Sequence, residues 1–210
     1  MKPLTLIMSF LPIIVFSLLS KLLPHGDIGY AALISAIFAD VNIVAHEPYW
    51  PPKILNVTQV TLFVILTIVS FASDAGTDRW AAIWIPAAVA LIIGVVILAT
   101  LPVIPFTEQF ARQSTPQAYW NSPTFKRINR VLSTGWGLAL IGVGISRLIA
   151  VIIEQNSTGS HRVIDLVFAA AIPVVILIYM LRFSKSYPEK VTHHDDGPKH
   201  ASPSAPTPAS

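Results

Sequence analysis

Three ionisable residues, Asp40, Arg147 and Asp165, stand inside otherwise apolar stretches of this 210-residue chain. A charge held away from water is costly, so such residues are usually paired or used to move an ion or a proton. Arg147 and Asp165 lie at the facing ends of two consecutive apolar stretches, which a short connection would make antiparallel neighbours. We therefore expect an ion pair between them, with a role in transport as the alternative.

Asp40 is followed by Asn42, His46 and Glu47, which makes its stretch the most polar of the apolar segments. A proton or cation relay would need such groups along one face of a helix, and Asp40, His46 and Glu47 do not share a face. We expect Asp40 to pair with a base such as Arg130. A small carrier or channel that uses these intramembrane charges remains the alternative.

Other kinds of active site find little support in the sequence. The chain has no cysteine, which excludes disulfides, thiolate metal ligands and thiol nucleophiles. It also lacks a phosphate-binding glycine loop, a His-Glu-x-x-His motif and a Gly-x-Ser-x-Gly motif. The histidines His193, His194 and His200 are typical of solvated residues in a polar tail. We therefore expect no enzymatic activity, no cofactor and no metal site.

The residues above must be positioned by helices that cross a membrane. Hydrophobic residues make up 53% of the chain and charged residues only 12%, too few to cover a soluble globule of this length. Crossing the hydrocarbon layer takes roughly 20 apolar residues. The sequence thus predicts an all-α, polytopic transmembrane helical bundle over residues 1–183, with about six spans: Leu4–Leu23, Ile28–Ala45, Ile54–Ala72, Trp80–Ile104, Val131–Ile153 and Val163–Phe183.

The distribution of basic residues predicts the orientation of these spans. Ten Lys and Arg residues fall on the side of the termini, against Arg79 and Arg162 on the other side. Cytoplasmic loops carry such an excess, so both termini are expected in the cytoplasm. The five Trp residues, Trp136 among them, are expected at the membrane interfaces. Residues 184–210 are polar and rich in Pro and Ser, and we expect a disordered cytoplasmic tail there.

The connection of residues 105–130 is long enough to hold structure of its own. Phe106 and Phe110 share one helical face, and a second helix is predicted to begin with Ser122 as its cap and Pro123 at its first position. An amphipathic segment in the cytoplasmic headgroup layer, anchored by Tyr119 and Trp120, is expected before the fifth span. The apolar face of this second helix carries Phe125, Ile128, Asn129 and Leu132, and its basic face carries Lys126, Arg127 and Arg130.

This basic face predicts contacts with anionic lipid headgroups, and the connection is the expected contact surface for partners. A basic loop that only obeys the topology rules is the alternative. Nucleic acid is not an expected partner, because the positive charges lie beside membrane segments.

Small residues recur at helical spacing along two of the predicted spans. Such stripes let neighbouring helices approach closely, within the bundle or in contact with another membrane protein. The fifth span carries Gly135, Ala139, Gly142 and Ser146, and the second span carries Ala32, Ser35, Ala36 and Ala39. Kinks are expected at Pro12, Pro86 and Pro173.

Three segments resemble a known family: Ser9–Phe16, Tyr30–Ile37 and the block from Tyr119 to Trp136. In their order and spacing they are similar to the bacterial septation protein A family of inner-membrane proteins, over most of residues 4–183. Phe106–Arg112 and Ser122–Arg130 depart from the family pattern, as in a divergent member.

The resemblance implies a small, non-enzymatic, multi-pass protein of the bacterial cytoplasmic membrane. It implies a role in cell-envelope biogenesis, membrane integrity or septation, through contacts with envelope and division proteins. It carries no catalytic residues over to this chain.

Overall fold

The computed structural model describes residues 3–23, 27–46, 53–73, 75–156 and 162–195. Within these ranges the chain forms helices and short connections, with no β-strand. In chain order the elements are α1 (Pro3–Leu22), α2 (Ile28–His46), α3 (Ile54–Ala72), α4 (Ala75–Thr100), α5 (Phe106–Ala111), the 3-10 turn η1 (Gln117–Tyr119), α6 (Pro123–Asn156), α7 (Arg162–Ile164), the π-helical segment η2 (Asp165–Ala171) and α8 (Ile172–Asp195).

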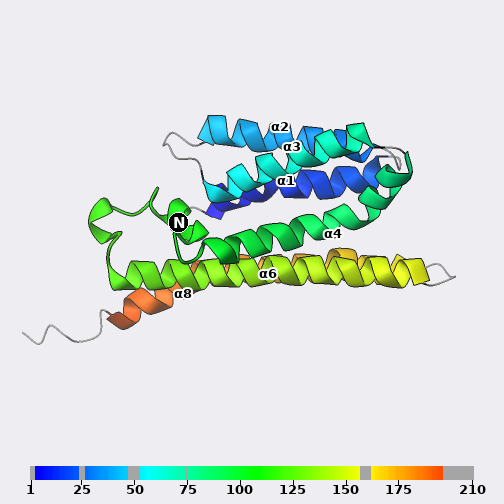
Figure 1. Ribbon diagram of the computed structural model, residues 1–210. Coiled ribbons are helices and arrows are strands. Elements are labelled where there is room, and N and C mark those ends of the chain that lie inside the picture. Colours follow the sequence, from blue (N-terminus) through cyan, green and yellow to red (C-terminus); the bar gives the residue numbers. More distant parts are fainter. Residues whose placement is uncertain (1–2, 24–26, 47–52, 74, 157–161, 196–210) are drawn as a thin grey trace, which may run out of the picture.

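The long helices run alongside one another in two groups (Figure 1). α2 packs against α1 and α3, while α6 lies between α4 and α8. α4 also contacts α1, α2 and α3, so it joins the two groups. The beginning of α1 and the end of α8 lie at the same end of the bundle, together with α5 and η1 (Figure 1).

Four stretches of the described chain are long and apolar enough to cross a membrane: Ile54–Ala72, Ile83–Thr100, Pro123–Asn156 and Leu166–Thr192. The shorter apolar stretches Met8–Ser20 and Ile28–Val41 belong to α1 and α2, which are 20 and 19 residues long. The outer surface of the bundle is apolar, as lipid contact requires. The prediction of an all-α helical membrane bundle is confirmed.

α4 differs from the predicted fourth span because it ends at Thr100 instead of continuing to Ile104. Pro102 and Pro105 follow directly, and a proline disfavours helical backbone at the residue before it. The apolar residues from Leu101 to Ile104 therefore form a non-helical connection between α4 and α5 at the end of the bundle.

Aromatic rings fill the centre of the bundle. The ring centroids of Phe16 and Phe63 lie 5.1 Å apart, and the Phe10 ring stacks on Trp136 with 4.9 Å between their centroids. The Trp136 side chain is 1% exposed, and its Nε1–H donates to Ser184 Oγ at 2.9 Å. Protein groups therefore satisfy both the ring and the N–H of Trp136, while its expected depth at the membrane interface stays a prediction.

Ser146 and Pro173 explain the π-helical segment η2. In η2 the Ile172 N–H donates to the carbonyl of Val167, five residues earlier. The next carbonyl in this pattern, that of Phe168, would need an N–H from Pro173, which has none. Ser146 Oγ donates to the Phe168 carbonyl at 2.6 Å, so a side chain of α6 supplies the missing donor.

The small residues of α6 meet α8 on one side of the helix. A Cβ added to Gly135 would lie 2.9 Å from Met180 Cε, and one added to Gly142 would lie 3.6 Å from Ile176 Cδ1. Ala139 is buried in the same stripe. On α2 the predicted stripe is buried within the bundle as well: Ala32, Ser35, Ala36 and Ala39.

A second small-residue face of α6, which the sequence did not single out, meets α4. A Cβ added to Gly94 would lie 2.8 Å from the Gly137 carbonyl oxygen. At Gly144 the added Cβ would lie 2.5 Å from Leu91 Cγ. α4 and α6 therefore approach so closely that glycine is required at their contact.

α6 is one helix of 34 residues, so the second helix predicted from Ser122 is continuous with the fifth span and is not a separate helix. Its first turns continue the span along the same line, because the buried face of these turns packs on α5. At 1.5 Å per residue α6 is about 51 Å long, well beyond the roughly 30 Å hydrocarbon layer.

The prediction of disorder is wrong for residues 184–195, since α8 continues to Asp195. Phe183 and Tyr187, one helical turn apart, contact each other with 5.2 Å between ring centroids. Thr192 Oγ1 donates to the Pro188 carbonyl at 3.0 Å. These local contacts favour helix over disorder in residues 184–195. Residues 196–210 lie outside the described residues.

Candidate functional site

α5 is inserted into the end of the bundle that holds the beginning of α1 and the end of α8 (Figure 1). Phe106 and Phe110 are 0% and 2% exposed, with their rings 6.0 Å apart. The Ile54 N–H at the start of α3 donates to Gln109 Oε1 at 2.9 Å, and Lys53 Nζ lies 4.8 Å from the centre of the Phe110 ring. The two phenylalanines share a face, as predicted, but that face is covered by protein.

A buried group of hydroxyls joins α5 to α6. Thr107 Oγ1 donates to the Asn129 carbonyl at 2.8 Å and lies 2.8 Å from Ser133 Oγ. The Thr107 N–H donates to Ser133 Oγ at 3.1 Å. Because Thr107, Asn129 and Ser133 are at most 1% exposed, these bonds hold α5 in place without competition from water.

A cation–π contact between Arg112 and Trp120 joins the two ends of the connection that follows α5. Arg112 donates to Glu108 Oε1 from Nη2 at 2.6 Å and from Nε at 3.1 Å. Its guanidinium carbon lies 4.9 Å from the centre of the Trp120 ring, and Trp120 Nε1–H donates to the Thr115 carbonyl at 2.9 Å. Trp120 therefore stabilises the connection, whereas Tyr119 is 60% exposed.

Ser122 begins α6 as the sequence predicts. Its Oγ accepts the Phe125 N–H at 3.2 Å, and its carbonyl accepts the Lys126 N–H at 3.1 Å. Pro123 occupies the first helical position, where a missing N–H costs nothing. This cap fixes where the basic residues of the first two turns of α6 lie.

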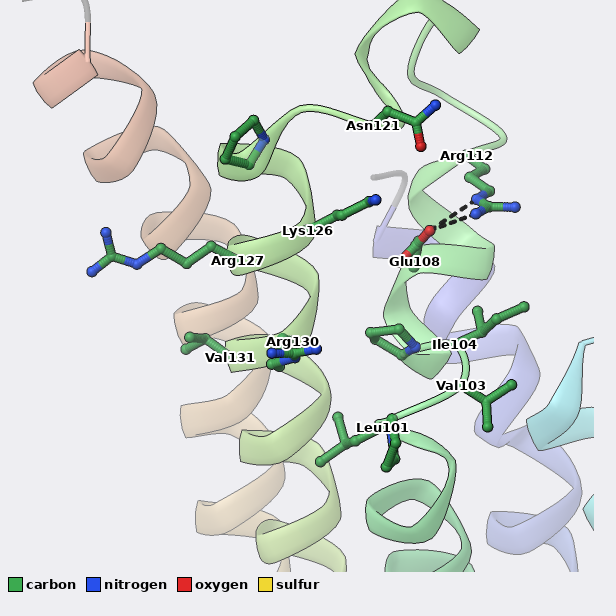
Figure 2. A pocket seen from close by; sticks show the side chains of 13 residues that line it. Leu101, Val103, Ile104, Glu108, Arg112, Asn121, Lys126, Arg127, Arg130 and Val131 are labelled. Carbon is green, nitrogen blue, oxygen red and sulfur yellow. Dashed lines mark hydrogen bonds and ion pairs between the residues drawn. The ribbon is translucent and has the colours of Figure 1, made fainter.

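A cavity of about 560 Å³ opens between the α4–α5 connection, α5 and the first turns of α6 (Figure 2). The volume falls within the range of roughly 300–1,000 Å³ that is usual for small-molecule sites. The lining residues are Leu101, Pro102, Val103, Ile104, Pro105, Glu108, Arg112, Asn121, Pro123, Lys126, Arg127, Arg130 and Val131.

Four basic side chains and a single carboxylate line this cavity, which makes it cationic. The carboxylate, Glu108, is engaged by Arg112. Lys126, Arg127 and Arg130 form no ion pair with any other residue that the structure describes. Lys126 extends from α6 toward α5, and Arg130 lies opposite the α4–α5 connection, whereas Arg127 points away from α5 (Figure 2).

Polarity changes along the cavity. Leu101, Val103 and Ile104 lie near the end of α4, where the membrane-crossing part of the bundle begins (Figure 2). Asn121 and Lys126 lie farther from the spans (Figure 2). The sequence identified the basic residues of the cavity but not its apolar wall, because these apolar residues were assigned to the fourth span.

The structure does not bring Asp40 and Arg130 together. Asp40 is exposed on the outer surface of α2, near Ile37 and Val41, which are each 54% exposed. Arg130 lines the cavity on α6, in the other group of helices. The predicted pairing of these two residues, both within the described ranges, is wrong.

The other intramembrane candidates are described only in part. Arg147 is half-buried on α6, which packs against η2, and Asp165 begins η2. The side chains of Asp165, Asn42 and His46 lie outside the described residues, so the ion pair between Arg147 and Asp165 stays a prediction. The described side chains include no group of three suited to a metal ion; the side chains of His193, His194 and His200 lie outside the described part.

Comparison of the chain with family models, curated proteins and solved structures found no match. The function of this end of the molecule is therefore inferred from its own chemistry and geometry.

Proposed function

We propose that this chain is a non-enzymatic inner-membrane protein that works through protein and lipid contacts at the cationic end of its bundle. The observation that carries the proposal is the cavity, where Lys126, Arg127 and Arg130 stand without an ion pair among the described residues. Its place in cell-envelope biogenesis, membrane integrity or septation is supported by the resemblance of Ser9–Phe16 and Tyr30–Ile37 to septation protein A.

Exposed positive charge at the end of a membrane bundle attracts two kinds of partner, anionic headgroups and acidic protein surfaces. Arg127 and Tyr119 are both exposed at this end. Tyrosine and arginine, together with tryptophan, are enriched among the residues that contribute most to the binding energy of protein contacts. They form the surface on which we expect envelope or division proteins to bind.

The described polar groups inside the bundle support an interaction role over a carrier. Gln59 Nε2 donates to the Ser9 carbonyl at 2.8 Å, next to the carbonyl that Pro12 deprives of its helical donor. Ser146 Oγ donates to the Phe168 carbonyl, which Pro173 leaves without a donor in the π-helical pattern. These groups satisfy main-chain carbonyls, which is a structural task. A carrier that uses Asp40 is only the second candidate, because Asp40 is exposed on the outer surface of α2 and does not lie inside the bundle.

The proposal is tested by a cross-linked pull-down from native membranes. The intact chain is compared with Tyr119→Ala/Arg127→Glu, which changes exposed side chains and leaves Trp120 in place to stabilise the connection. Lys190→Glu is the matched control, since it makes the same charge change at an exposed site on α8. We expect envelope or division proteins with the intact chain and the control, and their loss with the double variant.

Recovery of the same proteins by the double variant would overturn the proposal. In that case, flux across vesicles containing the reconstituted chain, with Asp40→Asn and Arg147→Gln as variants, becomes the decisive measurement for a carrier.

A further inference from the structure

We propose that the cavity binds the phosphate headgroup of one anionic phospholipid, with the glycerol and the first acyl carbons along its apolar wall. This inference rests on the proposed function, because both assign the work of the protein to the same end of the bundle. It goes further by naming one built site and one class of ligand, in place of diffuse attraction between a basic surface and a membrane.

The cationic part of the cavity suits a phosphate diester. Lys126 and Arg130 are four residues apart on α6, so their Cβ atoms are neighbours at roughly 5–6 Å on one helical face. Neither forms an ion pair with the described residues, and both line the cavity. An Arg guanidinium can hold two phosphate oxygens at once, and a Lys ammonium adds a point charge.

The single carboxylate does not cancel this charge. Arg112 holds Glu108 through two hydrogen bonds to one oxygen, at 2.6 and 3.1 Å, and Glu108 is only 5% exposed. The contact of Arg112 with the Trp120 ring fixes this pair on the α5 side of the cavity. The charges of Lys126 and Arg130 are therefore left for a ligand.

The order of polar and apolar walls favours a lipid over a free phosphate ion. Leu101 lies toward the spans, Ile104 and Val131 lie about level with Arg130, and Lys126 lies farther from the spans (Figure 2). Val103 at the same wall is 80% exposed. A free phosphate ion would leave this wall uncovered, whereas a phospholipid presents its phosphate and its glycerol in this order along the membrane normal.

The test uses the purified full-length chain in detergent, titrated with short-chain phosphatidylglycerol and, separately, with phosphatidylcholine, and read by native mass spectrometry. We expect one phosphatidylglycerol per chain, bound more tightly than phosphatidylcholine. Lys126→Gln/Arg130→Gln should weaken phosphatidylglycerol binding at least tenfold. The control Lys185→Gln/Lys190→Gln removes two exposed charges from α8 at the same end and should leave binding within twofold.

Equal weakening by the two double variants would overturn the site, because it would indicate diffuse attraction. Equal binding of both lipids would overturn it as well. A competition with inorganic phosphate separates the two possible sources of the ligand. If inorganic phosphate at a concentration equal to that of the lipid displaces the lipid, the site binds a soluble phosphate compound and the lipid assignment is wrong.

Two further controls keep the result interpretable. Lys126→Arg/Arg130→Lys keeps both charges, so it should bind the lipid even if the glutamine variant unfolds, and failure to bind would overturn the proposal. The purified chain contains no partner protein, so lipid binding with a failed pull-down contradicts only the proposed function. Recovered partners without selective lipid binding contradict only this inference.

Discussion

At the scale of single residues, the backbone beside prolines depends on side chains from neighbouring helices. Ser146 donates to the Phe168 carbonyl, which Pro173 leaves without a donor, and Gln59 donates to the Ser9 carbonyl beside Pro12. A buried carbonyl without a partner is costly where no water reaches it. The Ser146 hydroxyl is therefore explained by a local backbone need before any transport role is invoked.

Glycines at helix contacts provide a matched pair of predictions at this scale. Gly94→Ala would place a Cβ 2.8 Å from the Gly137 carbonyl oxygen, and backbone cannot yield as a flexible side chain does. We expect a loss of about 1–3 kcal/mol in the free energy of unfolding, because α4 and α6 must separate. The measurement is unfolding in mixed micelles, followed by circular dichroism.

Gly142→Ala is the control for this comparison. The added Cβ would make only an ordinary contact, 3.6 Å from Ile176 Cδ1. Alanine is favoured over glycine in a helix by up to about 1 kcal/mol, so the change should be neutral or stabilising. Equal destabilisation by both substitutions would show that the α4 contact is no tighter than the α8 contact.

At the scale of elements, α5 is held by tertiary contacts and not by its own helical propensity. Six residues are too few for a stable isolated helix. Its bonds reach to Ser133, 26 positions away, and to Ile54, 55 positions away. The element that forms one side of the cavity therefore depends on the bundle being assembled.

Thr107→Val tests how firmly α5 is held. Valine keeps the shape but removes the bonds to the Asn129 carbonyl and Ser133 Oγ, which should cost about 1–3 kcal/mol. We expect faster trypsin cleavage after Arg112 in the purified protein, because α5 leaves its site more often. Thr107→Ser keeps the hydroxyl and should be cleaved close to the wild-type rate. Unchanged cleavage of the valine variant would mean that these bonds do not hold α5.

The prediction of single elements succeeded where local sequence decides. Hydropathy predicted a span over Ile54–Ala72, and these are the bounds of α3. The hydroxyl of Ser122 predicted a helix cap there, and Ser122 Oγ accepts the Phe125 N–H. Periodicity shows which residues of α5 share a face, but not which helix covers that face. The burial of Phe106 and the apolar wall of the cavity depend on neighbours distant in sequence, so the sequence could not predict them.

At the scale of the whole molecule, an even number of passes and the basic residues predict that the cavity end faces the cytoplasm. The chain has no cysteine, so single cysteines report position without interference. We expect Asn156→Cys, at the far end of α6, to react with a membrane-impermeant thiol reagent in intact cells. Ser114→Cys, exposed near the cavity, should react only after the cells are opened. The reverse pattern would contradict the orientation.

The unbroken course of α6 makes it a molecular ruler. Asn156 at one end and Lys126 near the other belong to a single described helix without a hinge, so the number of residues between them sets the depth of the cations. One inserted residue between Gly137 and Gly144 would shift that depth by about 1.5 Å and rotate Lys126 by about 100° around the axis. The charge is therefore placed relative to the bilayer by residue count and helical phase as much as by its immediate neighbours.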